Sequence, residues 1–266
     1  MTGHDAIDTT TPHPARVHDW LLGGKDNFPA DEEMGRGLVA LDARAPDMAK
    51  ANRAFQHRAV RWLVTTGGVR QFLDIGTGIP TEPNLHGTAQ RAAPESRIVY
   101  ADNDPVVLRH ARALLGSTPE GVAEYVRADV REPEAVVEAA GKVLDLTRPV
   151  AVSLVALLHY VSDEEGPYEL VGRLLAPLPA GSYLVLSHAT GDYDRRSADS
   201  ATDRYRARGL TFAPRTREEV TGFFRGLELV EPGVSLAADW RPEPGEPVQV
   251  PGGGPVPGYV GVARKL

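Results

Sequence analysis

Short apolar runs alternate with amphipathic stretches from about residue 48 to the end of the chain. The run 149–155 is apolar at nearly every position, as in a strand covered on both faces, whereas 48–65 repeats apolar residues at helical spacing. Strands are predicted over residues 72–74, 97–102, 124–130, 149–155, 181–187, 227–230 and 258–262, and helices over residues 48–65, 84–93, 106–115, 132–144, 164–176 and 217–224. This alternation predicts an α/β fold, with a doubly wound, mostly parallel sheet and helices on both faces.

The two ends of the chain depart from this alternation. Residues 1–14 are polar and are expected to form a disordered tail. Helical patterns then predict an N-terminal helical extension over residues 15–47, which could act as a lid, ahead of a main domain over 48–266. Near the other end, residues 242–258 hold 11 Pro or Gly in 17 positions, which excludes helix and central strand and predicts a long loop at the sheet edge.

Composition narrows the class of protein. The net charge of −7 and the pI of about 5.6 disfavour broad nucleic-acid binding, and the arginines of 195–208 are interleaved with aspartates, as on a solvated helix. The absence of cysteine excludes disulfides, thiolate zinc sites and cysteine nucleophiles. No apolar stretch reaches about 18 residues, so no membrane span is expected. A cytoplasmic protein is the simplest interpretation, and the oligomeric state stays open.

A glycine loop directly follows the first predicted strand. The strand ends at Asp74, and Gly76 and Gly78 follow, so the backbone there can approach a ligand closely and adopt a positive φ. A dinucleotide site would have a third glycine at the position of Thr81, and it would avoid carboxylates beside a pyrophosphate. The acids Asp74 and Glu82 instead favour a cationic ligand, such as S-adenosylmethionine (SAM) with its ammonium and sulfonium groups. A plain strand–turn–helix connection is the alternative for this motif alone.

Two more acids end the next two predicted strands. Asp102 lies 28 positions after Asp74 (102 − 74), where an acid can accept hydrogen bonds from both ribose hydroxyls of a nucleoside. Asp129 ends the third strand and could accept a hydrogen bond from the adenine amino group. Each acid could also serve as a helix N-cap. Three acids at three successive strand ends, one of them before Gly-x-Gly, favour a nucleoside site.

With these motifs the chain resembles the class I SAM-dependent methyltransferases. The D-x-G-x-G loop of that family corresponds to Asp74, Gly76 and Gly78, its ribose acid to Asp102 and its adenine-side acid to Asp129. The third loop glycine that is frequent in the family is Pro80 in this chain.

The departure at Pro80 is shared by a narrower group that the chain is similar to, the actinomycete S-adenosyl methyltransferases of mostly unassigned substrate. Their marks are D-I-G-T-G-x-P-T, here at 74–81, and L-L-G-G-K-D-N-F, here at 21–28. The resemblance spans about 15–264 and implies a Rossmann-like sheet of seven strands with the last one antiparallel. It also implies SAM as the cofactor. The cofactor-binding positions expected on this basis and from the strand ends are Asp74, Gly76, Thr77, Gly78, Asp102, Asn103, Asp129, Val130, Ser153 and Leu154.

Three residues outside these motifs are further candidates. His159 follows the fourth predicted strand and could act as a general base, or it could be a structural histidine. Phe28, after the Gly23-Gly24 hinge, could cover the sulfonium by a cation–π contact, or pack in a docked helix. Arg53 could pair with the methionine carboxylate of SAM, or lie on the surface. The histidines show no metal-ligand spacing, so no metal is expected.

The function predicted is transfer of a methyl group from SAM to a small-molecule acceptor, whose identity the sequence does not give. One alternative is a protein that binds SAM or S-adenosylhomocysteine without catalysis. A second alternative is an NAD-dependent oxidoreductase, against which the missing third glycine and the flanking acids count.

Overall fold

The computed structural model describes residues 8–114, 116–242 and 255–266. Its strands are β1 (Gln71–Ile75), β2 (Arg97–Asp102), β3 (Val122–Arg127), β4 (Ala151–Leu154), β5 (Tyr183–His188), β6 (Glu228–Leu229), β7 (Ser235–Leu236) and β8 (Tyr259–Arg264). They form one sheet in the order β3-β2-β1-β4-β5-β8-β6, with β7 also paired to β8. Strands β1 to β5 pair in parallel and β8 runs antiparallel to its neighbours. The predicted doubly wound, mostly parallel sheet is confirmed, with the short β7 added.

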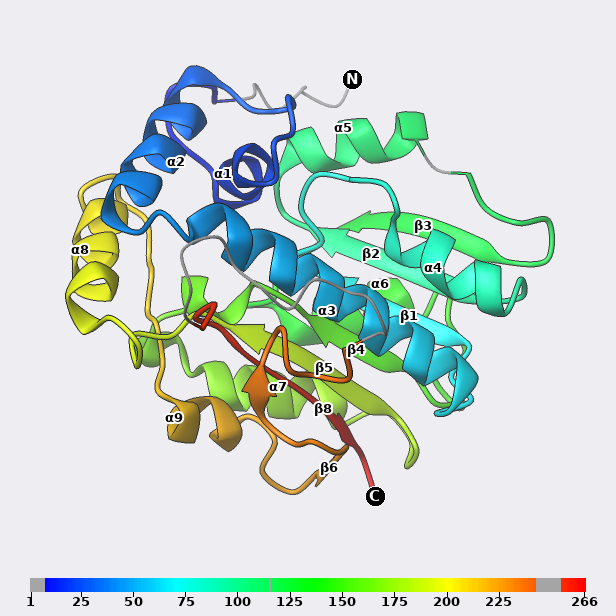
Figure 1. Ribbon diagram of the computed structural model, residues 1–266. Coiled ribbons are helices and arrows are strands. Elements are labelled where there is room, and N and C mark those ends of the chain that lie inside the picture. The colour runs from blue at the N-terminus through cyan, green and yellow to red at the C-terminus, as the bar shows by residue number, and fades with distance from the viewer. Residues whose placement is uncertain (1–7, 115, 243–254) are drawn as a thin grey trace.

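Helices cover both faces of the sheet because successive strand residues point to opposite sides. On one face, Phe72 and Ile98 pack with the helices α3 and α4. On the other face, Leu73 and Val99 pack with α6, α7 and α9 (Figure 1). The helices are α1 (Pro14–Leu21), α2 (Pro29–Leu41), α3 (Ala45–Thr65), α4 (Leu85–Ala92), α5 (Pro105–Leu114), α6 (Pro133–Ala140), α7 (Pro167–Leu175), α8 (Arg195–Arg206) and α9 (Arg217–Gly222).

The N-terminal helices lie together at one end of the sheet. Figure 1 shows α1 beside α2, and both helices also contact α3, while α8 packs against α2. Val17 and Met34 are buried there with Tyr205 of α8, in a small apolar cluster of their own. The predicted N-terminal helical extension therefore forms a cap over the main domain. Whether it moves as a lid stays a prediction.

The strand order reverses between β1 and β4, because the chain runs outward from β1 to β3 and then returns to β4. In doubly wound sheets this switch point opens a crevice at the carboxyl ends of the strands. The glycine loop after β1, the acid that ends β2 and the turn after β4 all meet at this point. The topology therefore brings most of the predicted site residues to one end of the sheet.

Some predicted boundaries differ from the structure. Residues 8–13 belong to the expected tail, yet His13 caps α1 and its ring lies 3.2 Å from the Asp104 carboxylate. The strand predicted over 124–130 already ends at Arg127, because the chain turns there toward α6. Of the predicted Pro/Gly loop, residues 243–254 lie outside the described residues.

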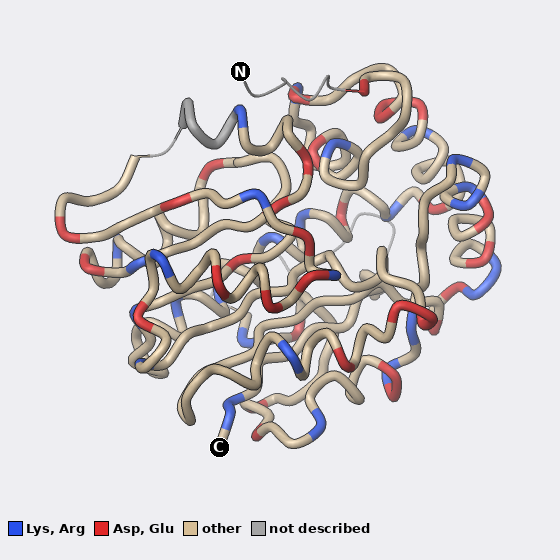
Figure 2. Tube along the Cα trace, turned by 180° about the vertical axis from the view of Figure 1, so that it is seen from behind, with Lys and Arg blue, Asp and Glu red and all other residues tan. Residues whose placement is uncertain are grey.

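Charges are spread over the surface of the described residues. Figure 2 shows basic and acidic residues interspersed rather than gathered on one face. Along α8, Arg195 pairs with Asp199 and Arg206 with Asp203, which agrees with the predicted mixed-charge helix. No helix among the described residues is long and apolar enough to span a membrane.

Candidate functional site

A cavity of about 300 Å³ opens at the switch point of the sheet. We call it the strand-end cavity. Its walls come from the glycine loop after β1, the ends of β2 and β3, the turn after β4, the segment 209–211 after α8, α3, and α1 as a roof. Of the predicted site residues it is lined by Gly76, Thr77, Gly78, Asp102, Asn103, Asp129, Val130 and Arg53.

The glycine loop has a backbone that only glycine adopts without strain. Gly76 and Gly78 have φ angles of +67° and +68°. A Cβ at Gly76 would come within 2.5 Å of the Leu157 side chain, whereas one at Gly78 would meet only Ala15, at 3.9 Å. The Gly76 N–H donates to the carbonyl of Ala101 at 2.8 Å, which ties the loop to β2. The loop is therefore held tightly between β2 and the turn after β4.

Asp102 fixes the far side of this loop. Its Oδ2 accepts a hydrogen bond from the Gly78 N–H and its Oδ1 accepts one from the Asp104 N–H, both at 2.9 Å. The side chain is buried, which raises the pKa of Asp102, while these two N–H groups act in the opposite direction. Each carboxylate oxygen has a second lone pair, so Asp102 can still accept from a ligand in the cavity.

The adjoining wall is polar and negatively charged. Asn103 donates through its side-chain amide to Asp129 Oδ2 at 2.8 Å, and the Arg131 N–H donates to Asp129 Oδ1 at 3.0 Å. Burial alone would raise the pKa of Asp129, but these donors and the charge of Arg131 hold it below its ordinary value. Asp129 is therefore ionised at neutral pH, beside the buried Val130.

Asp74 lies behind the cavity wall and does not line it. It is buried and accepts a hydrogen bond from the Gln56 amide at 3.2 Å. Burial raises its pKa to about 6, against the hydroxyls of Ser153 and Thr77 and the charge of Arg53. Asp74 thus supplies negative charge beneath the glycine loop, one layer away from a ligand.

Arg53 reaches the cavity from α3. Its Nη2 donates to the carbonyl of Thr81 at 2.6 Å, whereas its Nε is buried without a hydrogen-bond partner among the described residues. Burial lowers the pKa of Arg53 and the charge of Asp74 opposes this. A guanidinium with an unused donor at a cavity wall suits a carboxylate ligand.

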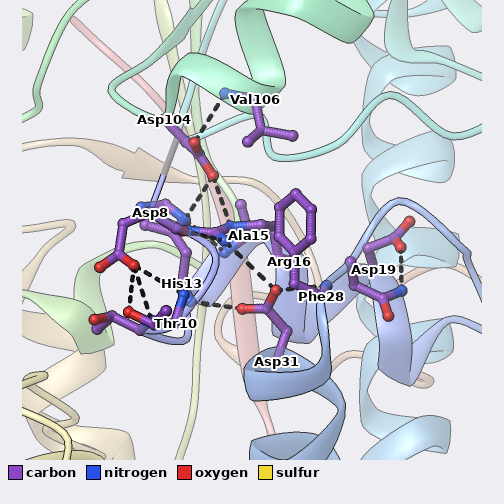
Figure 3. A network of polar contacts seen from close by, with 12 residues as sticks. Asp8, Thr10, His13, Ala15, Arg16, Asp19, Phe28, Asp31, Asp104 and Val106 are labelled. Carbon is purple, nitrogen blue, oxygen red and sulfur yellow. Dashed lines mark hydrogen bonds and ion pairs between the residues drawn. The ribbon is translucent and has the colours of Figure 1, made fainter. Parts of the chain in front are cut away.

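The roof is held in place by a buried ion network, shown in Figure 3. Arg16 of α1 lies between two carboxylates, 3.2 Å from Asp104 at the start of α5 and 3.6 Å from Asp31 of α2. Asp31 also accepts the N–H groups of His13 and Phe28, both at 2.8 Å. Arg16, Asp31 and Asp104 are all buried, so this network fixes α1 and α2 over the strand ends.

Phe28 has a different partner from the one predicted. Its ring faces the Arg16 guanidinium (Figure 3), with 5.3 Å between the guanidinium carbon and the ring centroid. The ring also packs with Ile79 and Val107. Phe28 does not border the strand-end cavity. The cation–π contact expected with a ligand is made with Arg16, because the ion network sets where residue 28 lies.

The residues near the end of β4 that line the cavity differ from those predicted. Ser153 and Leu154 are buried within the sheet and do not line the cavity, which is bordered instead by Val155, Ala156 and Leu157. Ala156 has a φ of +55°, an uncommon conformation for a residue with a Cβ, and its N–H donates to the Ser187 hydroxyl at 2.8 Å. Strained residues cluster at functional sites. No feature of the sequence marked Ala156.

A second cavity, of about 180 Å³, adjoins the first. We call it the apolar cavity. Four residues border both cavities and form what we call the neck: His18 of α1, Asn52 of α3, Ala156 and Tyr160. Sequence reasoning missed His18 and Asn52 as site residues, because nothing in their local pattern shows which helices meet at the strand ends.

His159 borders the apolar cavity and not the strand-end cavity. It is buried, and the Ala189 N–H donates to its Nδ1 at 3.4 Å. Burial, together with the charges of His188, His18 and Arg215, lowers the pKa of His159 well below its ordinary value. His159 is therefore a neutral imidazole with one nitrogen already accepting a backbone hydrogen bond. Its predicted role as a base stays a prediction.

The described residues contain no group of His, Asp and Glu side chains with the arrangement of a metal site. What the strand-end cavity offers is a glycine loop, the acids Asp102 and Asp129 near the ends of two strands, and the guanidinium of Arg53. This set can hold an uncharged nucleoside whose tail carries both an amino and a carboxylate group, since acids face hydroxyl and amino donors and Arg53 faces the carboxylate.

Comparison with known proteins agrees with this chemistry. The profile of a family described as S-adenosyl methyltransferase matches residues 1–266. A DUF574 family protein from Streptomyces avermitilis is 44% identical with a TM-score of 0.91, over 98% of this chain and 100% of that chain. A candidate methyltransferase from Thermobifida fusca is 38% identical with a TM-score of 0.87, over 97% of this chain and 96% of that chain. No curated protein matches the chain. The resemblance drawn from the sequence motifs is confirmed, and the chain belongs to the S-adenosyl methyltransferase family.

Proposed function

We propose that this protein transfers the methyl group of SAM to a small-molecule acceptor and binds SAM in the strand-end cavity. The observation that carries the proposal is the meeting of the Gly76–Gly78 loop, Asp102, Asp129 and Arg53 around one cavity at the switch point of the sheet. A surface loop or a set of helix caps would not bring these four features together.

The residues present fit the cofactor. Asp102 accepts from the ribose hydroxyls with the lone pairs left by its two backbone donors, and Asp129 accepts from the adenine amino group. Arg53, which lines the cavity, pairs through its guanidinium with the methionine carboxylate. Asp74, one layer behind the glycine loop, favours the ammonium and sulfonium charges through space. The glycine loop lets the methionine part cross close to the backbone.

When bound, SAM supplies a methyl group on sulfur that a lone pair of the acceptor displaces; the electron pair of the broken C–S bond passes to sulfur and the acceptor's proton goes to solvent. The protein's share is proximity and alignment, which can supply most of the acceleration of a direct displacement. The roof of α1 helps by excluding water, and the glycine loop and Arg53 fix the position of the reacting carbon.

The first experiment tests the cofactor. Isothermal titration with S-adenosylhomocysteine, SAM and NAD should show one site per chain for the first two and no comparable binding of NAD. At a ligand concentration of 100 times Kd the unfolding free energy should rise by roughly 2.7 kcal/mol. Tighter binding of NAD than of SAM would reject the assignment and favour the oxidoreductase alternative.

A second experiment separates an enzyme from a protein that only binds the cofactor. SAM labelled in its methyl group is incubated with a metabolite extract, with and without the protein. An enzyme moves the label into a new compound and forms S-adenosylhomocysteine in equal amount. A binding protein protects SAM without moving the label. The Asp102→Ala variant, which should bind SAM weakly, serves as the control for uncatalysed transfer.

A further inference from the structure

The apolar cavity touches the strand-end cavity only through the neck, where His18, Asn52, Ala156 and Tyr160 border both. It lies between the N-terminal cap, α8 and the ends of β5 and β8. A molecule in it would therefore face a ligand of the strand-end cavity across the neck. This is the placement that a methyl acceptor needs, because its nucleophile must come within about 3–3.5 Å of the methyl carbon.

Most of the apolar cavity is lined by aliphatic and aromatic side chains, among them Leu38, Leu41, Met48, Ala201 and Phe212. The rings of His159, Tyr160 and Phe212 pack against one another in tilted or edge-to-face arrangements, with centroids 4.4 to 6.1 Å apart. Such a wall offers ring faces and edges to a further aromatic ring. The lining therefore favours a flat, apolar ligand.

The basic groups around this cavity are already paired or uncharged. Arg44 and Asp42 form a two-pronged ion pair with contacts of 2.7 and 2.9 Å, and Asp194 accepts from the N–H and the hydroxyl of Ser197. His188 donates through Nδ1 to the Ala189 carbonyl and accepts from Arg215 at Nε2, and burial lowers its pKa to about 3. An anionic ligand would find no free counter-charge among these groups, and any charged ligand would lose its hydration in the cavity.

Two polar side chains of the neck are free to bind a ligand. The side chains of His18 and Asn52 make no hydrogen bond to any other described residue, and both border the two cavities. Burial, with the charge of Arg53 adding to it, lowers the pKa of His18 to about 4, so its imidazole is neutral and one ring nitrogen can accept a hydrogen bond. The Asn52 amide can donate as well as accept. These groups suit a hydroxyl or amino group at the end of a ligand that points toward the neck.

We propose that the apolar cavity is the acceptor site, and that the acceptor is an uncharged aromatic compound of one or two rings whose hydroxyl or amino group is oriented by His18 and Asn52 at the neck. This rests on the proposed function, since it assigns the partner of the methyl transfer. The size agrees: an apolar cavity of about 150 Å³ holds a benzene molecule, and this one has about 180 Å³ with an opening toward the neck. His18 and Asn52 are positioning residues in this proposal.

The test uses the full chain saturated with S-adenosylhomocysteine and three probes: 2-naphthol, naphthalene and 2-naphthoate. Saturation is measured first, and its failure would speak against the cofactor assignment and not against the acceptor site. In the saturated protein, 2-naphthol should bind at least tenfold more tightly than 2-naphthoate by ligand-observed NMR titration. Equal or tighter binding of the carboxylate, or no binding of 2-naphthol, would overturn the proposal.

Two variants of α8 locate the binding. Ala201 borders the apolar cavity, so Ala201→Phe should fill it and weaken 2-naphthol binding at least tenfold, with the affinity for S-adenosylhomocysteine changed less than twofold. Ala207, at the end of the same helix, is exposed, and Ala207→Phe should change neither affinity. If 2-naphthol binds Ala201→Phe as tightly as the native protein, the acceptor site lies elsewhere.

The role of the neck is tested by comparing the affinities of 2-naphthol and naphthalene, which differ only in the hydroxyl group. In the native protein 2-naphthol should bind roughly 3- to 10-fold more tightly than naphthalene, the value of one net hydrogen bond. In His18→Ala and Asn52→Ala this preference should shrink while naphthalene binds as before. A preference that survives both substitutions would show that the hydroxyl is not oriented by these residues.

Discussion

The carboxylate of Asp102 accepts a hydrogen bond from the backbone N–H of Gly78 at 2.9 Å, so the acid that ends β2 holds the glycine loop that follows β1. The same carboxylate accepts the Asp104 N–H with its other oxygen. Asp102 therefore has two tasks, as support for the loop and as a wall of the cavity. Loss of its charge should affect both.

The Asp102→Asn variant tests this double role. An amide has one acceptor oxygen and a donor in place of the second, so one of the two N–H groups loses its partner. We expect the affinity for S-adenosylhomocysteine to fall at least tenfold and the unfolding free energy to fall by about 1–3 kcal/mol. Titration calorimetry and urea unfolding measure the two effects. Asp203→Asn, on the exposed face of α8, should change neither, and an unchanged affinity in Asp102→Asn would reduce Asp102 to a structural acid.

Arg53 lines the strand-end cavity and is expected to bind the carboxylate of SAM through its guanidinium. Arg53→Met keeps much of the side-chain length and removes the charge, so it should weaken binding of S-adenosylhomocysteine by roughly 10- to 100-fold, since hydrogen bonds to charged groups are worth about 1.5–3 kcal/mol. 5′-Methylthioadenosine, which lacks the carboxylate, should bind both proteins alike. Lys50→Met on the same helix is exposed and serves as the control. If Arg53→Met binds S-adenosylhomocysteine and 5′-methylthioadenosine more weakly by the same factor, Arg53 supports the fold of the site and does not bind the carboxylate.

The network of Arg16 with Asp31 and Asp104 should decide whether the N-terminal cap stays docked. Arg16→Met leaves two buried carboxylates without their cation, which costs about 3–5 kcal/mol in comparable cases. Arg36→Met removes an exposed helix pair with Glu32 and should cost less than about 0.5 kcal/mol. Urea unfolding compares the two variants.

Hydrogen exchange shows where the network acts. In Arg16→Met the amides of α1 and α2 should exchange faster than in the native protein, while those of α4 keep their rates. In the native protein, S-adenosylhomocysteine should slow exchange in α1 if the cap closes over the ligand as a lid. Equal rates in α1 with and without ligand would mean that the cap is docked permanently.

Stability should fall on mild acidification because several histidines are buried as neutral groups. The pKa values of His18 and His57 are lowered to about 4 and that of His188 to about 3, by burial first and by nearby arginines. Their folded pKa values are below the unfolded value near 6.5, so their contribution is complete above that pH and is lost as the pH falls toward 4. Asp74, with its pKa raised to about 6, acts in the opposite direction.

Five of the described histidines have lowered pKa values, with His86 and His159 added to these three, against two carboxyls with raised ones, Asp74 and Asp102. We therefore expect the unfolding free energy to fall between about pH 6 and 5 by more than about 1.4 kcal/mol per pH unit, the value of one net proton. Urea unfolding at a series of pH values measures the slope. His57→Gln removes one of these histidines, so the slope of the unfolding free energy against pH should decrease by the value of about one proton, roughly 1.4 kcal/mol per pH unit. A free energy that is constant or rises toward pH 5 would contradict the buried neutral state of these rings.

The sheet and the strand-end acids could be predicted because their signals are local. Each apolar run that ends on Asp74, Asp102 or Asp129 is only a few residues long, and it predicts both a strand and the acid at the end of that strand. Parallel pairing then brings the ends of β1, β2 and β3 to one edge. The glycine loop and the strand ends were found in this way, with errors of one to three residues where the chain leaves a strand, as at Ser153 and Ala156.

Apart from Arg53, the walls contributed by helices could not be predicted, because they depend on contacts between distant parts of the chain. The roof lies over the cavity because Arg16 reaches Asp104, and no periodicity within residues 14–41 reports on residue 104. His18 comes to the site with α1, and Asn52 comes to it with α3. Phe28 shows the same effect: its ring was expected to face a ligand, and in the structure it faces Arg16 of α1.

The position of the cap in the chain has a consequence for synthesis on the ribosome. Arg16 is synthesised 88 residues before Asp104 (104 − 16). The nascent helices α1 and α2 therefore emerge with Arg16 and Asp31, which are buried in the folded protein, before the domain on which they dock exists. The cap can settle only after β1 and β2 have left the exit tunnel and paired. SAM can therefore bind only late in the synthesis of this protein. A ribosome stalled before residue 104 would hold a chain that cannot retain SAM.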